Sequence, residues 1–228
     1  MLIKFKPSFS IFILCLFGVF NLCAQEAYHK YYISSVSANF LSDDNLKNRI
    51  DPSNFDMHFL NAAVFHLTNI ERSNADLPLF DFYDNLYKSA VLHSESMIEY
   101  DYLDHVNRIK KKWRTPKDRI LYFDSSYSSL AENILENNLL EHEGEILKYR
   151  IVKNSDDTIL YLDLNANEIK YGSYLYIAKR LVLQWMNSPP HRANILDDKM
   201  RLLGCSCAID ETKVPVMIRC TQNFGIIK

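Results

Sequence analysis

The stretch from Trp185 to Leu196 constrains this chain more than any other, because it stops an amphipathic helix at a defined place. Apolar residues at the spacing of one helix face lead into it: Tyr174, Ile177, Ala178, Leu181 and Trp185. Pro189 and Pro190 then remove two backbone donors and push Ser188 away from helical angles. We therefore expect the helix to end near Ser188, with His191 on a stiff corner just beyond it.

The residue type at this corner allows two interpretations. An imidazole with an unperturbed pKa near ~6.5 can bind a metal, move a proton or donate a hydrogen bond. Alternatively, His191 only caps or packs the helix end. The spacing by itself does not choose between them.

The beginning of the chain predicts export. Two lysines precede an apolar run from Phe9 to Phe20, and Ala24 offers a small residue for cleavage, so residues 1–24 are predicted to be a signal peptide. The run is too short to span a bilayer, and we expect a secreted or periplasmic protein with no transmembrane anchor. A lipid anchor through Cys23 is the weaker alternative, because Leu22 precedes it where a small residue is expected.

The charge balance argues against nucleic acid as a partner. Removal of residues 1–24 takes away two lysines and moves the formal net charge from -2 to -4. Beyond the short run Lys110-Lys111-Lys112 there is no basic cluster, and that run is predicted to be a solvated surface.

The rest of the chain predicts one α+β domain, and its 228 residues, 48% of them hydrophobic, suffice for a single core. Residues 25–55 lack a sustained period and are assigned to an N-terminal extension. Periodicity predicts helices after Asp51-Pro52 and from near Asp81, a hairpin within 145–164, and strands at about 203–209 and 214–224. His93 falls on the apolar face of the second helix and is expected to be a packing residue. Helices on both sides of a few strands indicate a layered domain.

Six short motifs then occur in a characteristic order. They are Thr68 to Arg72 with Leu77-Pro78-Leu79, His93 to Met97, Asp104-His105, Ala131 to Ile134, Trp185 to Leu196, and Thr221 to Gly225. In these motifs the chain resembles the bacterial branch of the CAP superfamily, the cysteine-rich secretory and pathogenesis-related type of domain, also called SCP. The resemblance implies a three-layer α-β-α sandwich with a small antiparallel sheet over residues 56–228, an inserted hairpin-like segment at about 135–170, and a cleft lined by histidines and acids.

Position by position, the resemblance implies that His105, Glu132 and His191 meet in this cleft. Two neutral imidazoles and one carboxylate are ligands that suit zinc, which makes zinc the candidate ion although no cofactor is certain. Ser188 stands where the superfamily often has a glutamate, which removes a candidate general base.

Three further residues are expected to line the cleft: Asn133, Ser188 and Arg192. For Asn133 and Arg192 the alternative is that they tie loops to the core. Arg119 is expected to make a structural pair with a carboxylate or with backbone carbonyls.

The resemblance implies a binding module rather than an enzyme, with a cleft for a divalent cation and a lipid, peptide or glycan ligand nearby. One alternative is a zinc-dependent hydrolase that uses Glu132 as its base. Another is an envelope or surface interaction protein with a vestigial cleft, in which the inserted segment makes the contact.

Three cysteines remain after removal of the signal peptide, and an exported protein meets an oxidising compartment. A turn around residues 210–213 would place Cys220 nearly opposite residue 204 or 205. We therefore predict a bond between Cys205 and Cys220, with Cys207 buried and free. The alternative is three reduced cysteines packed in the core.

Overall fold

The computed structural model describes residues 28–32, 39–142, 148–155 and 158–228. The predicted signal peptide, residues 1–24, lies outside the described residues. The helices are η1 (Asp44–Lys47), η2 (Pro52–Asn54), α3 (Met57–Asn74), α4 (Asp84–Glu99), η3 (Lys111–Trp113), α5 (Pro116–Phe123), α6 (Tyr174–Asn187) and α7 (Pro189–Ile195). The strands are β1 (Asp81–Phe82), β2 (Tyr127–Asn138), β3 (Arg150–Lys153), β4 (Ile159–Leu162), β5 (Glu168–Ile169), β6 (Leu202–Asp210) and β7 (Met217–Ile227).

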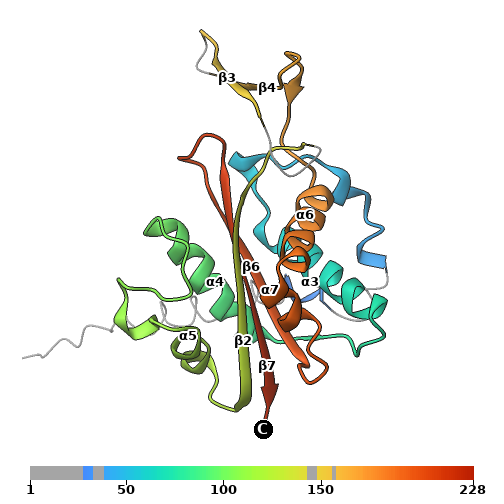
Figure 1. Ribbon diagram of the computed structural model, residues 1–228, viewed down its shortest axis with the longest axis vertical. Coiled ribbons are helices and arrows are strands. Elements are labelled where there is room, and N and C mark those ends of the chain that lie inside the picture. The colour runs from blue at the N-terminus through green and yellow to red at the C-terminus, as the bar shows by residue number, and fades with distance from the viewer. Residues whose placement is uncertain (1–27, 33–38, 143–147, 156–157) are drawn as a thin grey trace, which may run out of the picture.

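The main sheet has the strand order β1-β6-β7-β2 and lies between two helical layers (Figure 1). Helices α4 and α5 cover one face, and α3, α6 and α7 cover the other. Strand β1 runs parallel to β6, and the remaining pairs are antiparallel. The predicted α-β-α fold is confirmed. Across the described residues, no helix is both long and apolar enough to cross a membrane.

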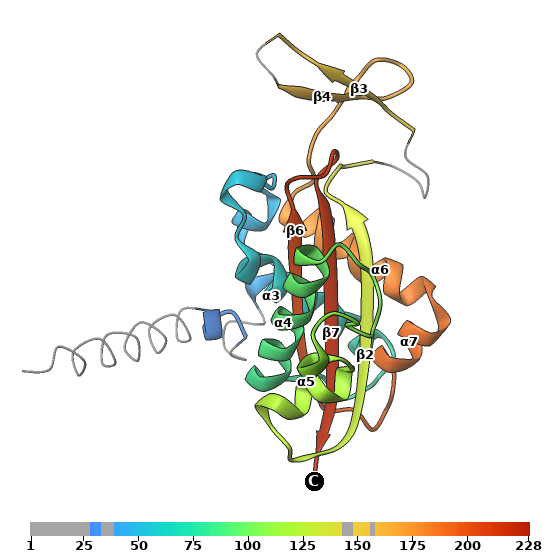
Figure 2. The same ribbon diagram turned by 90° about the vertical axis from the view of Figure 1, so that its left-hand side faces the viewer.

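A second, three-stranded sheet, β3-β4-β5, projects from the end of this body (Figure 2). The predicted hairpin is confirmed for the residues that the structure describes, since β3 pairs antiparallel with β4. Strand β5, which the sequence analysis did not predict, adds to the other edge of β4. Strand β2 also escaped prediction. It runs from Tyr127 to Asn138 and so overlaps the beginning of the segment predicted to be inserted at about 135–170.

The double proline acts as predicted and also begins a new helix. Helix α6 ends at Asn187, and Pro189 and Pro190 occupy the first two positions of α7, where proline needs no backbone donor. Ser188 is both the C-cap of α6 and the N-cap of α7. His191 therefore lies in the first turn of a short helix.

The first two predicted helices begin later than the sequence suggested. Pro52 opens the short helix η2, and α3 begins at Met57 because the Asp56 side chain accepts a hydrogen bond from the Phe59 amide. The residues near Asp81 form β1 instead, because they pair with β6, and α4 begins only at Asp84.

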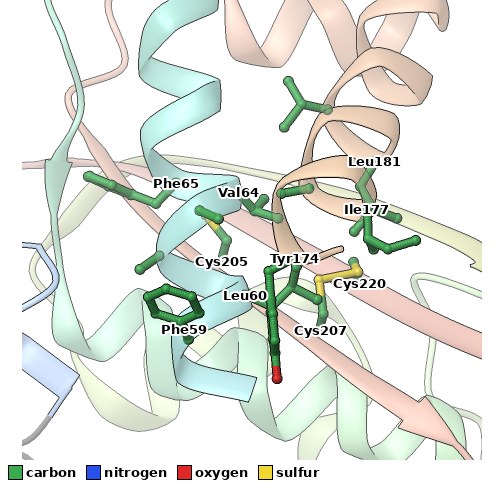
Figure 3. Packing of buried hydrophobic residues seen from close by; sticks show 14 of the residues in the cluster. Phe59, Leu60, Val64, Phe65, Tyr174, Ile177, Leu181, Cys205, Cys207 and Cys220 are labelled. Carbon is green, nitrogen blue, oxygen red and sulfur yellow. A yellow bond between two sulfur atoms is a disulfide. The ribbon is translucent and has the colours of Figure 1, made fainter. Parts of the chain in front are cut away.

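The largest core cluster joins α3, α6 and the strands β6 and β7 (Figure 3). Phe59, Leu60, Val64 and Phe65 of α3 pack with Tyr174, Ile177 and Leu181 of α6 over the cysteines of the sheet. The N-terminal extension also belongs to this core, because Phe40, Leu46 and Ile50 are at most 3% exposed. Its described residues, which include the short helices η1 and η2, are packed as part of the domain.

On the other face, α4 approaches β6 so closely that only glycine fits at one position. A Cβ atom at Gly204 would lie 2.0 Å from the backbone nitrogen of Tyr87. Backbone atoms cannot rotate away as a side chain can, so Gly204 sets the distance between α4 and the sheet.

The cysteine prediction was wrong in its pairing. The structure joins Cys207 to Cys220 and leaves Cys205 free and buried. The reason is the register, because β7 begins at Met217, paired with Asp210, and the connection is longer than predicted. This places Cys207 directly opposite Cys220 and Cys205 opposite Gln222.

Candidate functional site

The candidate site is centred on a buried carboxylate on β2. The side chain of Glu132 is only 2% exposed, and that of Arg119 on α5 is 1% exposed. Arg119 Nη2 donates to Glu132 Oε1 at 2.9 Å and to Oε2 at 2.8 Å. A buried charge needs such a partner, and here the guanidinium engages both oxygens.

Two histidines approach the same carboxylate oxygen from different elements. His105, in the segment after α4, bonds to Glu132 Oε1 through Nδ1 at 2.8 Å. His93 on α4 is fully buried, and its Nε2 lies 3.7 Å from that oxygen without a hydrogen-bond partner. Asn223, with its amide oriented so that both polar atoms are satisfied, donates to Glu132 Oε2 at 3.1 Å.

These contacts set the protonation states of the cluster. Burial by itself would raise the pKa of Glu132, but the His105 hydrogen bond and the Arg119 charge hold this pKa below its usual range. Burial lowers the pKa of His93 to about 4, so this imidazole is neutral at pH 7. The site therefore holds an ionised glutamate beside a neutral buried histidine.

Among the described residues, the His191 side chain makes no hydrogen bond to Glu132 or His105, but it interacts with His105 electrostatically. Its pKa is lowered by burial and then by the charge of His105. Its backbone carbonyl accepts a hydrogen bond from Asn133 Nδ2 at 3.1 Å. Asn133 follows Glu132 on β2, and adjacent strand residues point to opposite faces of a sheet. The structure thus brings His105 and Glu132 into direct contact, and it places His191 close enough to His105 for the charge of His105 to lower the pKa of His191.

The residues do not fit the zinc site that the sequence suggested. Glu132 would have to supply a ligand oxygen, yet both of its oxygens accept from Arg119, whose positive charge opposes a cation at the same place. Within the described ranges, no group of three or more His, Cys, Asp or Glu side chains is arranged to hold a metal ion. We assign no metal to His105, Glu132 and His191.

A cavity of about 650 Å³ opens beside His105 and Glu132. It lies between α5 and the beginning of β2, and its lining comprises His105, Thr115, Pro116, Lys117, Leu121, Ser125, Tyr127, Ser128, Ser129, Leu130, Ala131, Glu132 and Lys228. The described residues that line it do not include Asn133, Ser188 or Arg192, which were expected to line the cleft. Asn133 instead ties α7 to β2, since its Oδ1 also accepts from Asn194 at 2.8 Å.

Sequence reasoning identified some members of this cluster and missed the roles of others. Arg119 was correctly expected to pair with a carboxylate or with carbonyls, but nothing in its position indicated that the carboxylate was Glu132. His93 was expected to be a packing residue, and it is buried. Its place beside Glu132 follows from the way α4 crosses the sheet, which no local pattern encodes.

This geometry defines a class of protein: a three-layer α-β-α domain with a buried glutamate, held by an arginine and a histidine, beside a polar cavity. The family model for CAP, the cysteine-rich secretory protein family, matches residues 65–224. The chain belongs to this family.

The Bacillus anthracis structure, one of the similar solved structures, supports the fold. An extracellular protein with an SCP domain from Bacillus anthracis has a TM-score of 0.50 and 21% identity, with 79% of this chain and 45% of that chain covered. An outer surface protein from Borrelia burgdorferi has a TM-score of 0.49 and 17% identity, with 80% of this chain and 99% of that chain covered. This chain therefore spans less than half the length of the Bacillus protein. No curated protein matches this chain.

Proposed function

We propose that this chain is an exported ligand-binding protein whose cavity beside His105 takes a small amphiphilic anion. The observation that carries the proposal is the state of Glu132. A carboxylate held by Arg119 and His105 is a fixed structural charge that neutralises the cavity wall. It is poorly placed to accept a proton from a water molecule, as a hydrolase would require.

The chemistry of the lining supports an anionic, partly apolar ligand. Lys117 brings positive charge to the cavity, whereas the one carboxylate side chain of the lining, that of Glu132, is already paired with Arg119. Serine and threonine hydroxyls provide neutral donors, and Leu121 and Leu130 provide apolar surface. A volume of about 650 Å³ lies in the range of small-molecule sites. Of the lipid, peptide and glycan classes that the sequence leaves open, this mixture favours a lipid-like amphiphile.

The cysteines support export. The bond between Cys207 and Cys220 requires an oxidising compartment, which agrees with the signal peptide predicted over residues 1–24. Sequencing of the mature protein's N-terminus checks this part of the proposal, and we expect it to begin at Gln25.

The ligand is tested with octanoate and with octanol as its neutral counterpart. Calorimetry of the full mature chain should show saturable octanoate binding, and amide resonances of residues 115–131 should shift. Lys117→Ala should weaken octanoate binding about five-fold, because about 1 kcal/mol of charge attraction is lost, and should leave octanol binding unchanged.

The matched control is Lys179→Ala, which removes an exposed lysine of α6 on the opposite layer. It should bind octanoate as the wild type does. Equal binding of octanoate and octanol by the wild type, or shifts confined to residues outside the cavity, would contradict the proposal.

A further inference from the structure

The segment between α4 and α5 is strongly polarised in charge. Residues 108–114 contain five lysines and arginines and no acidic residue, in a chain whose formal net charge is -2. All five of these basic side chains are exposed. We call residues 108–114 the basic segment. It lies on the layer of α4 and α5, away from α6 and α7 (Figure 1).

The basic segment is held in a fixed shape by two buried side chains. The backbone amide of Asn107 donates to the Arg114 carbonyl at 2.7 Å. The Asn107 side-chain oxygen accepts from the backbone amides of Ile109 and Lys110, both at 2.9 Å. At the other end, Arg119 Nη1 donates to the carbonyls of Trp113 and Arg114 at 3.2 Å. The charges are therefore presented on a closed, anchored loop rather than on a free one.

Apolar side chains are exposed among these charges. Ile109, within the segment, is 54% exposed, and Tyr122 of α5 is 52% exposed. The Lys112 ammonium lies 4.2 Å from the centre of the Tyr122 ring, which places this aromatic side chain at the edge of the segment. The Trp113 ring lies 6.0 Å from that of Tyr122.

We propose that the basic segment docks on a bilayer that contains anionic phospholipid. Lysine and arginine near such a surface are attracted by about 1 kcal/mol each, and isoleucine and aromatic side chains gain by entering the boundary between headgroups and acyl chains. A soluble polyanion would engage the charges equally well but would leave Ile109 exposed to water. The exposed apolar residues are therefore the reason to favour a bilayer.

This inference does not rest on the proposed cavity ligand, because none of residues 108–114 lines that cavity among the residues described. The test measures sedimentation of the mature full-length chain with vesicles of phosphatidylcholine containing 30 mol% phosphatidylglycerol, and with pure phosphatidylcholine vesicles. We expect binding to the anionic vesicles only, and its loss at high salt because exposed charges are screened.

Two variants separate charge from apolar insertion. The double variant Lys111→Ala with Arg114→Ala should weaken vesicle binding about 30-fold, because each removed charge contributes about 1 kcal/mol of attraction. Ile109→Ser should weaken it about five-fold but leave binding to heparin, a soluble polyanion, unchanged. The matched control is Lys179→Ala with Lys199→Ala, which removes the same charge from exposed positions elsewhere and should bind vesicles as the wild type does.

Circular dichroism establishes that each variant is folded. Absence of binding to the anionic vesicles would overturn the proposal. It would also be overturned if Lys179→Ala with Lys199→Ala weakened vesicle binding as much as Lys111→Ala with Arg114→Ala. If Ile109→Ser binds these vesicles as tightly as the wild type, and heparin binds as well as the vesicles do, the segment is a polyanion site and the bilayer proposal is wrong.

Discussion

At the scale of single residues, Glu132 and Arg119 depend on each other. Both side chains are almost completely buried, so each charge has lost its hydration and is compensated mainly by the other. Arg119 also donates to the His105 carbonyl at 3.0 Å, and thereby holds the backbone of a residue that contacts the same carboxylate. One guanidinium thus fixes the carboxylate and the neighbouring loop.

Removal of one partner of this buried pair should destabilise the protein far more than replacement of both partners. Arg119→Ala is expected to lower the free energy of unfolding at pH 7 by about 3 to 5 kcal/mol, because it leaves a buried charge without its partner. The double variant Arg119→Met with Glu132→Gln should be more stable than Arg119→Ala. Urea denaturation measures all three proteins. A change below about 0.5 kcal/mol in Arg119→Ala would show that the pair is not structural.

His93 should make the protein sensitive to acid. Its pKa is about 4 in the folded protein, because burial and then the charges of Arg119 and His105 outweigh the attraction of Glu132. An unfolded histidine titrates near ~6.5, so the unfolded state binds more protons below that pH and folding weakens as the pH falls toward 4. Above pH ~6.5, His93 is neutral in both states and this loss of stability is absent.

Protonation linked to His93 should lower the free energy of unfolding by about 2 to 3 kcal/mol between pH 7.5 and pH 4.5. The measurement is the free energy of unfolding at both values for the wild type and His93→Gln. The variant should lose less stability than the wild type over this interval. An equal loss in both proteins would assign the acid sensitivity to other groups.

At the scale of elements, strand register decides the chemistry of the cysteines. Cys205 and Cys207 lie on the same face of β6, so either could face Cys220 if the two strands slid along each other. The pairing of Asp210 with Met217 fixes the register and selects Cys207. Cys205 is then left inside the core, where burial raises the pKa of its thiol.

Peptide mapping of the oxidised protein should therefore find Cys207 linked to Cys220, and the Cys205 thiol should resist alkylation until the protein is unfolded. Cys207→Ser should lower stability by about 2 to 3 kcal/mol, the chain-entropy value for a loop of this length. Cys205→Ser, the matched control, should leave the bond in place. A linked Cys205 would mean that the strand register is different.

At the scale of the whole molecule, the two additions to the layered domain differ in how they attach. The N-terminal extension places Phe40, Leu46 and Ile50 in the main core. The inserted segment instead leaves and returns at neighbouring points, since the amide of Glu141 donates to the Lys170 carbonyl at 2.8 Å. Its small sheet projects from the body (Figure 2).

Excision of the two additions should therefore have opposite outcomes. Replacement of residues 142–169 by Asn-Gly, which suits a tight hairpin turn, should move the melting temperature by less than about 5 °C. A chain that begins at residue 51 should lose several kcal/mol, at about 1.5 to 3 kcal/mol for each buried apolar side chain, and should fail to fold. Thermal denaturation followed by circular dichroism compares both with the full mature chain. Loss of folding in the excised variant would show that the inserted segment supports the core.

The sequence by itself determined the local features of this protein. The double proline predicted a helix end near Ser188, and the alternating residues within 145–164 predicted a hairpin, because backbone donors and side-chain periodicity act over a few neighbouring residues. The order of motifs was sufficient to predict the family and its α-β-α layers.

Only the tertiary structure decided which distant residues meet. Whether Glu132 is a metal ligand or the partner of a buried arginine depends on how α5 packs against β2, and whether Cys205 or Cys207 forms the bond depends on a shift of two residues between β6 and β7. Such outcomes arise from packing and strand register over the whole domain. No spacing within a single segment carries that information.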